Sequence, residues 1–287
     1  MKKLLLILLC LPMIVFGQQT INDSMQINGI YRNFITYVPS IYKSSQPSPL
    51  IFNLHGRTGS AWGQMWKGDF RKIADTANVI IVHPQGLIDN AGVTHWNLGH
   101  SNIDDIGFLN SLYSYIASIY NINLDKVYST GMSNGGYMSY YLACNMSDKI
   151  AAIASVAGSM GSFMQLNCNP THPTPVMEIH GTADVIVPFN NILKGIEYWR
   201  NYNNCNLIAD TTFIKDINLG DLSSVKHIVY NNGDNGVTTE LFKIINGGHT
   251  WPGNNRSKRL TNYDINASLE IWKFFSKYDI NGLIKPQ

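Results

Sequence analysis

Hydrophobic and polar positions in this chain fall into two alternating patterns. Apolar runs of strand length, each closed by turn residues, predict strands at residues 33–38, 50–54, 79–82, 126–130, 149–156, 176–180, 225–230 and 239–245. Apolar residues at helical spacing predict helices at residues 69–77, 104–120, 136–143, 192–203 and 264–275. Short apolar strands alternating with helices favour a mostly parallel sheet with helices on both faces.

Length and composition favour a single domain. The chain has 287 residues and 45% hydrophobic content, which is enough for one large α/β core. No internal repeat, low-complexity tract or Pro/Ser-rich linker divides it. We therefore expect residues 18–287 to form one catalytic domain.

The first residues resemble a secretory leader. Lys2 and Lys3 precede an apolar run at residues 4–16, and small residues at Val15 and Gly17 precede a cleavage point before Gln18. This pattern predicts a signal peptide at residues 1–17, because the run is too short for a spanning helix. A retained N-terminal anchor is the alternative. No later run is long and apolar enough to span a bilayer, so we expect a secreted chain, periplasmic or extracellular, with no membrane partner.

The charge balance limits the class of binding partner, and the cysteine content predicts a disulfide. Removal of Lys2 and Lys3 leaves 19 basic against 19 acidic residues, and this balance argues against a nucleic-acid partner. We expect a monomer. The remaining cysteines are Cys144, Cys168 and Cys205, which predict one disulfide and one free thiol in an oxidising compartment, with the pairing open.

A G-x-S-x-G pentapeptide is the strongest chemical signal. Gly131-Met132-Ser133-Asn134-Gly135 follows a predicted strand and precedes a predicted helix. A serine on a sharp strand-to-helix turn is typical of a nucleophile elbow, and glycines let strand and helix approach closely. The alternative is a glycine-rich turn with an incidental serine.

A serine nucleophile needs a base and a group that orients the base. Asp184 follows the strand at 176–180 within a short turn, and His249 lies in a glycine-rich loop after the strand at 239–245. Among the eight histidines only His249 has both the chain order and the loop context that this chemistry requires. A turn or N-cap role is the alternative for Asp184.

Acyl transfer also needs donors for the developing oxyanion. The backbone N–H of Asn134 is the first candidate, and the N–H of Arg57 or Thr58 is the second, with the choice left open. Trp251, Trp96 and Trp62 are candidate substrate contacts, although packing is the commoner role of a tryptophan.

The paired carboxylates Asp104-Asp105 could hold a metal, but a helix cap is the favoured interpretation. No C-x-x-C or His/Cys cluster has zinc spacing, so we expect no metal site.

Together these segments resemble the secreted esterase family that groups polyhydroxybutyrate depolymerases with feruloyl and acetylxylan esterases. The matching pieces, in the family's order, are Leu54-His55-Gly56, His83-Pro84-Gln85-Gly86, Trp96-Asn97, Asp104-Asp105-Ile106-Gly107-Phe108, the pentapeptide with Gly136, His180-Gly181-Thr182-Ala183-Asp184 and Gly248-His249-Thr250-Trp251-Pro252-Gly253. The resemblance implies an α/β-hydrolase fold, no cofactor and an acyl-enzyme. It also implies that Ser133 is the nucleophile, His249 the base and Asp184 its orienting acid.

The resemblance leaves the substrate open. Depolymerases of solid polyester in this family typically carry an adsorption domain, and no such domain fits here, so we expect esters on plant polysaccharide, feruloyl before acetyl. A soluble hydroxyalkanoate ester is the runner-up. A secreted peptidase and a catalytically inactive binding protein are the rivals from other classes.

Overall fold

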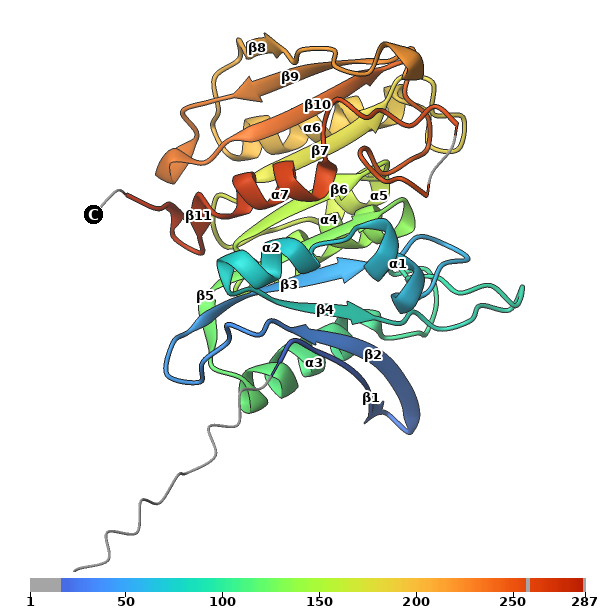
Figure 1. Ribbon diagram of the computed structural model, residues 1–287, viewed down its shortest axis with the longest axis vertical. Helices are drawn as coiled ribbons and strands as arrows, with labels where there is room; N and C mark the ends of the chain where they lie inside the picture. The colour runs from blue at the N-terminus through green and yellow to red at the C-terminus, as the bar shows by residue number, and fades with distance from the viewer. Residues whose placement is uncertain (1–16, 257–258, 286–287) are drawn as a thin grey trace, which may run out of the picture.

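A ten-stranded sheet forms the centre of the molecule in the computed structural model, which describes residues 17–256 and 259–285 (Figure 1). The strand order is β1-β2-β4-β3-β5-β6-β7-β10-β9-β8. These strands are β1 (Gln19–Ile27), β2 (Ile30–Val38), β3 (Ser48–Leu54), β4 (Ile80–Pro84), β5 (Ile122–Met132), β6 (Ala152–Val156), β7 (Val176–Gly181), β8 (Asp210–Phe213), β9 (Ser224–Tyr230) and β10 (Thr239–Ile245). Apart from Gly17, the predicted signal peptide lies outside the described residues.

The six central strands, from β4 through β10 in the sheet order, run parallel to their neighbours. Antiparallel pairs close both sides, β1 with β2 at one and β9 with β8 at the other. In the parallel strands the carboxyl ends meet at one edge of the sheet, where ligand sites of α/β folds form. The predicted α/β-hydrolase-type, single-domain architecture is thereby confirmed.

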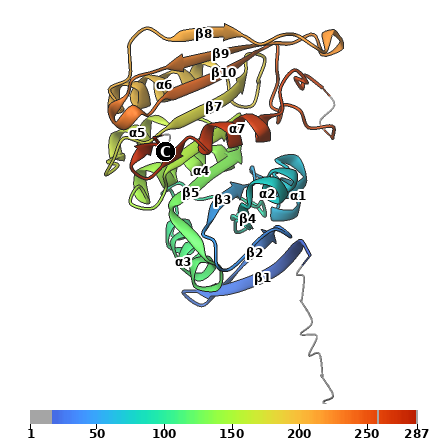
Figure 2. The same ribbon diagram turned by 60° about the vertical axis from the view of Figure 1, so that its left-hand side comes forward.

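Helices cover both faces of the sheet, as predicted (Figure 2). One hydrophobic cluster packs α3, α4 and α6 against the sheet, and a second packs α2 and α7 against the opposite face. The helices are α1 (Ala61–Lys67), α2 (Arg71–Ala77), α3 (Asp105–Ile119), α4 (Asn134–Asn145), α5 (Ser162–Asn167), α6 (Asn190–Tyr202) and α7 (Ala267–Phe275). Shorter elements are the 3-10 turns η1 (Leu219–Asp221) and η2 (Asp234–Gly236) and the hairpin of β11 (Tyr278–Asp279) with β12 (Gly282–Leu283).

Most elements match the sequence pattern, and the exceptions have physical reasons. β1 was not predicted because its residues are largely exposed and polar, although Asn28-Gly29 between β1 and β2 is a strong hairpin signal. The strand expected at 149–156 begins only at Ala152, and the helix expected at 264–275 begins at Ala267 behind its cap, Asn266.

Two local predictions can be compared directly with the structure. The Asp104 carboxylate accepts a hydrogen bond from the Gly107 N–H at 2.7 Å and caps α3, as expected of one member of the Asp104-Asp105 pair. The expected disulfide joins Cys144 at the end of α4 to Cys168 beyond α5, and Cys205 is a buried free thiol. The disulfide therefore fastens the loop after α5 to the helix that follows Ser133.

Candidate active site

Ser133 occupies a strained turn at the carboxyl end of β5. Its backbone has φ 54° and ψ −119°, a conformation that costs a non-glycine residue of the order of 1–3 kcal/mol. A Cβ on Gly135 would lie 2.2 Å from the Leu54 carbonyl oxygen, and one on Gly131 would lie 2.6 Å from the same atom. Only glycines permit this close crossing of β3, β5 and α4, so the sequence builds a sharp elbow with Ser133 at its tip.

The turn after β7 and the loop after β10 are joined to each other. A Cβ on Gly181 would lie 2.2 Å from the Gly247 carbonyl oxygen, and the Ala183 N–H donates to that oxygen at 2.8 Å. This contact places the Asp184 carboxylate 2.7 Å from the Nδ1 atom of His249. The predicted acid and the predicted base, 65 residues apart in the chain, therefore form a hydrogen-bonded pair.

The Asp184 carboxylate is held in its ionised form. Burial would raise its pKa, but the hydrogen bond to His249 and those from the Val187 and Ile186 N–H groups outweigh burial and lower the pKa below its usual value. An ionised Asp184 accepts a hydrogen bond from Nδ1 of His249, which leaves Nε2 free to take a proton. This is the tautomer that a general base beside a serine needs.

Ser133, Asp184 and His249 all lie at the carboxyl edge of the parallel strands, directly after β5, β7 and β10. The structure hydrogen-bonds His249 to Asp184, whereas the hydrogen bonds of the described residues include none between the Ser133 hydroxyl and the His249 ring. Catalytic hydrogen bonds are often loose without substrate and tighten in the complex.

The loop after β3 lies against Ser133 and carries the two candidates for the second oxyanion donor. A Cβ on Gly56 would lie 3.3 Å from the Ser133 Cβ, so the next residues lie beside the serine. The Thr58 N–H donates to the Thr94 carbonyl at 2.9 Å, while among the described residues the Arg57 N–H has no hydrogen-bond partner. With the N–H of Asn134, which opens α4, Arg57 provides the pair of unused donors next to Ser133.

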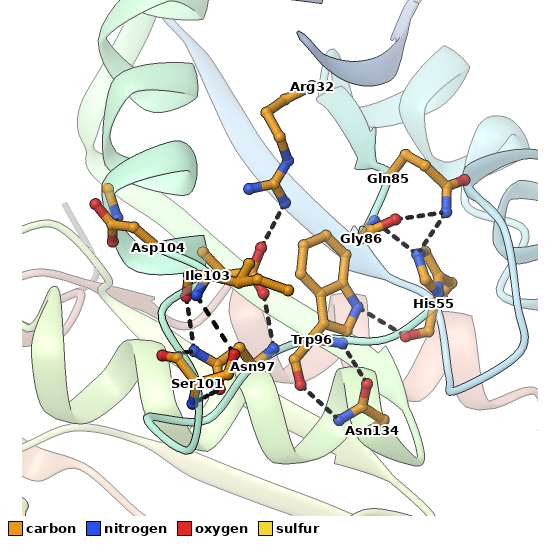
Figure 3. A network of polar contacts seen from close by, with 12 residues as sticks. Arg32, His55, Gln85, Gly86, Trp96, Asn97, Ser101, Ile103, Asp104 and Asn134 are labelled. Atoms are coloured by element: carbon orange, nitrogen blue, oxygen red, sulfur yellow. Dashed lines mark hydrogen bonds and ion pairs between the residues drawn. The ribbon is translucent and has the colours of Figure 1, made fainter. Parts of the chain in front are cut away.

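A neutral histidine fixes the bend of this loop (Figure 3). His55 donates from Nδ1 to the Gly56 carbonyl at 2.8 Å, and its Nε2 accepts from the Gly86 N–H at 2.9 Å. Gln85 lies 3.1 Å from the same Nε2, and the Trp96 indole N–H donates to the His55 carbonyl at 2.9 Å. Burial lowers the pKa of His55 to about 4, which keeps Nε2 available as an acceptor.

The Asn134 side chain holds the loop that carries Trp96 (Figure 3). Its Oδ1 accepts from the Trp96 N–H at 2.6 Å, and its Nδ2 donates to the Trp96 carbonyl at 3.2 Å. The next residue, Asn97, donates its N–H to the buried carboxylate of Asp105 at 2.7 Å, and Arg32 forms an ion pair with that carboxylate. A continuous polar network thus joins β2 to the turn that carries Ser133.

A second buried network lies beneath Asp184, and sequence reasoning missed it. His180 has its Nδ1 atom 2.9 Å from Glu178 and its Nε2 atom 2.8 Å from the Val187 carbonyl and 3.4 Å from Asp184. The Tyr140 hydroxyl donates to the other Glu178 oxygen at 3.0 Å. Burial would lower the pKa of His180, but Glu178 outweighs it and raises that pKa. The signal was present, since residues two apart on a strand share a face.

The three tryptophans predicted to contact substrate differ in their exposure to solvent. Trp96 and Trp251 are each 1% exposed, and the indole of Trp251 packs edge-on against Phe70 and donates to the Ser268 hydroxyl at 3.2 Å. Both therefore have packing roles in this structure, contrary to the expectation of direct substrate contact. Trp62 is 45% exposed and lines a hollow of about 460 Å³ beside β1 and β2.

Two structural features of the described part of the chain concern metals and membranes. No group of three or more His, Cys, Asp or Glu side chains there could hold a metal ion. Within the same residues, every helix is too short or too polar to cross a bilayer.

Comparison with known proteins adds to this geometry. A family model described as phospholipase/carboxylesterase matches residues 110–215. The chain is 26% identical over 268 residues to a bifunctional acetylxylan esterase/xylanase of Neocallimastix patriciarum, an alignment that covers 92% of this chain and 36% of that protein. It is 30% identical over 192 residues to a probable feruloyl esterase C of Aspergillus niger, covering 64% of this chain and 66% of that protein. The chain thus spans about a third to two thirds of these relatives.

Among solved structures, an acetyl xylan esterase from Aspergillus awamori superposes with a TM-score of 0.67 at 15% identity. The match covers 91% of this chain and 99% of that one. At this identity the likeness shows that the two chains share a fold.

Proposed function

Because this chain belongs to the α/β-hydrolase family of esterases that includes feruloyl and acetylxylan esterases, we propose that it hydrolyses carboxylic esters on plant polysaccharide, feruloyl esters before acetyl esters. The relatives support both kinds of ester, since one is named an acetylxylan esterase and the other a probable feruloyl esterase. A hydroxyalkanoate ester is the runner-up substrate.

One juxtaposition carries the proposal. Ser133 lies on a strained elbow at the same sheet edge as the hydrogen-bonded pair of Asp184 and His249, with the unused N–H groups of Arg57 and Asn134 beside it. Nucleophile, base, orienting acid and two oxyanion donors are the parts that acyl transfer through a serine requires. Strain at a polar residue is itself typical of functional sites.

In the first half of the reaction, the Ser133 hydroxyl oxygen attacks the ester carbonyl carbon while Nε2 of His249 takes the hydroxyl proton. The carbonyl oxygen becomes an oxyanion that accepts hydrogen bonds from the Asn134 and Arg57 N–H groups. Asp184 stabilises the imidazolium through Nδ1. The intermediate collapses, the sugar alcohol leaves with the proton from His249, and an acyl-enzyme on Ser133 remains.

In the second half, a water molecule attacks the acyl carbon and His249 takes a proton from it. Collapse of this second intermediate breaks the bond to Ser133, whose oxygen regains the proton from His249. The products are the free carboxylic acid and the unmodified serine. Every proton transfer goes through His249, and neither a metal nor a cofactor takes part in this scheme.

We also infer that the chain acts outside the cytoplasm after removal of residues 1–17. The support is the leader pattern in the sequence together with the Cys144–Cys168 disulfide, because structural disulfides persist in oxidising compartments.

Three substrates assayed side by side test the proposal: methyl ferulate, acetylated xylan and a hydroxybutyrate oligomer. We expect ester hydrolysis above buffer for the first two, with the higher kcat/KM on methyl ferulate. Turnover of the oligomer alone would replace the leading substrate by the runner-up, and turnover of none of them would sink the esterase proposal. The Ser133→Ala variant is the control for contaminating esterases.

A further inference from the structure

A hollow of about 490 Å³ lies between the helices α1 and α2, the start of α7 and the loop that follows His249. Trp66, Lys67, Lys72, Trp251, Asn254 and Arg256 are among the residues that line it, and Ser133, Asp184 and His249 are not. The Asn254 side chain donates to the Trp66 carbonyl at 3.0 Å and to the Lys67 carbonyl, so the two walls are tied together. The hollow is therefore a built feature of the fold and separate from the reacting groups.

The charges in this hollow are one-sided. Within the described part of the chain, Lys67, Lys72 and Arg256 have no ion pair with a carboxylate. The one carboxylate in the lining, Asp69, is bound by the Arg71 guanidinium, with Nε at 2.9 Å and a terminal nitrogen at 2.7 Å. Among the described residues, the lining thus presents three cations without a carboxylate partner, and such a set of cations favours an anionic ligand.

The Trp66 ring contacts two arginine side chains, Arg71 and Arg256. It is 38% exposed, and the guanidinium of Arg256 lies 4.5 Å from its ring centre. The Arg71 guanidinium lies 3.8 Å from the same ring centre. An arginine held over an aromatic ring loses less conformational freedom when it binds a ligand, and its planar fork suits a carboxylate.

We propose that this hollow is a subsite for the carboxylate of a hexuronic acid residue on the polysaccharide whose ester is cleaved at Ser133. The inference rests on the proposed function for the identity of the chain that crosses the site. Arg256, Lys67 and Lys72 bind the carboxylate, and the neutral amides of the lining and the Trp66 ring contact the sugar.

Position and size agree with this assignment. Trp251 and Pro252 follow His249 by two and three residues, and α1 follows the Arg57 loop, so both walls of the hollow continue segments that frame Ser133. A sugar chain whose ester lies at Ser133 can extend along these segments. A volume of about 490 Å³ is in the range of small-ligand sites and holds one or two sugar rings. Carboxylates are also the ordinary anionic group of cell-wall polysaccharides.

Direct binding tests the subsite without using turnover. Ser133→Ala protein is titrated calorimetrically with a glucuronic-acid-substituted xylo-oligosaccharide and with the unsubstituted oligosaccharide of equal backbone length. We expect at least tenfold tighter binding of the acidic ligand, weakening as salt rises. In the Ser133→Ala background, Lys67→Gln with Arg256→Gln removes that preference.

Lys194→Gln is the matched control, because Lys194 is an exposed cation on α6, across the sheet from the hollow. This variant should keep the full preference for the acidic ligand. Trp66→Ala leaves the three cations in place but frees the Arg256 guanidinium from the ring, and we expect an intermediate loss. Equal binding of the two oligosaccharides by the parent protein, or an undiminished preference in the double variant, overturns the subsite. The esterase assays fail or succeed separately, so an inactive protein with a strong acidic preference would contradict only the proposed function.

Discussion

Two buried histidines at the same edge of the sheet are held in opposite ways. His55, after β3, makes hydrogen bonds only to neutral groups, and burial lowers its pKa to about 4. His180, at the end of β7, lies beside Glu178, and that carboxylate raises its pKa despite equal burial. Burial alone therefore does not set the pKa of a histidine in this protein. The hydrogen-bonded partner decides it: neutral groups beside His55 and the Glu178 carboxylate beside His180.

The difference in charge agrees with the catalytic role proposed for each region, oxyanion binding after β3 and stabilisation of protonated His249 after β7. The β3 side carries the N–H groups proposed to bind the oxyanion, and the histidine that shapes this loop, His55, is neutral. The β7 side must stabilise a positive His249, and ionised groups gather there around Asp184. We therefore expect substitutions on the charged β7 side to have the largest effects.

Replacing Asp184 by Asn is expected to have the largest effect. The amide keeps the size of the side chain and the hydrogen bonds from the Ile186 and Val187 N–H groups, but it removes the charge and favours the wrong His249 tautomer. We expect kcat on methyl ferulate to fall about 10³- to 10⁴-fold. Thermal unfolding of the same variant controls for folding, and a loss under tenfold would contradict the role of Asp184.

Glu178→Ala removes the partner of His180. A buried ion pair that loses one member typically costs about 3–5 kcal/mol, because the remaining group stays buried without its partner. We expect a loss of that size in the free energy of urea unfolding. Glu197→Ala on α6 is the matched control, since its carboxylate is 64% exposed and lies 3.8 Å from Arg200, and it should cost under about 0.5 kcal/mol. Similar losses for both variants would show that the Glu178–His180 pair is not special.

The neutral state of His55 is tested by the pH dependence of protein stability. The folded protein binds a proton at His55 only near pH 4, whereas the unfolded chain binds it near 6.5. Between these values the unfolded state holds more protons, so stability is complete above pH 6.5 and falls as the pH drops towards 4, by at most about 3 kcal/mol from this residue.

Comparison with His55→Asn isolates this contribution. Burial also lowers the pKa of His83, to about 3, so the parent protein loses stability from more than one histidine on acidification. The variant should lose less between pH 6.5 and 4 than the parent does, as measured by urea unfolding. Parallel curves over that range would mean that His55 is not held neutral.

Asn134→Ala is expected to have the smallest effect. Two hydrogen bonds to the Trp96 backbone disappear, which we expect to cost about 1–2 kcal/mol of unfolding free energy and less than tenfold in kcat, because the backbone N–H remains. Asn145→Ala is the control on the exposed end of the same helix, where the side chain bonds only to the Tyr141 carbonyl. A loss in kcat as large as that of Asp184→Asn would place the side chain, rather than the N–H, in the chemistry.

Residue positions that depend on local patterns could be predicted from the sequence, whereas those that depend on distant contacts could not. The Ser133, Asp184 and His249 positions follow from local patterns, since each lies directly after a strand whose apolar run is visible in the sequence. The difference between the Arg57 and Thr58 N–H groups could not be predicted, because it depends on Thr94, 36 residues beyond Thr58, accepting the Thr58 N–H.

Long-range contacts explain the other differences. The clamp between Asn134 and Trp96, and the burial of Trp96 and Trp251, depend on loops whose paths have no local signature. β1 pairs with β2 along its whole length, and Met25 and Ile27 pack against the core, but most of its side chains are exposed, so its apolar pattern is weak. Glu178 and His180 were within reach of sequence reasoning, as two polar residues on one face of an apolar strand.

The most direct test of the account is the site of covalent labelling by a fluorophosphonate probe in the folded protein, located by mass spectrometry of the digested chain. We expect one labelled residue, Ser133, with labelling abolished in Ser133→Ala and strongly slowed in Asp184→Asn. Labelling at another serine, or esterase activity that survives in Ser133→Ala, would contradict it.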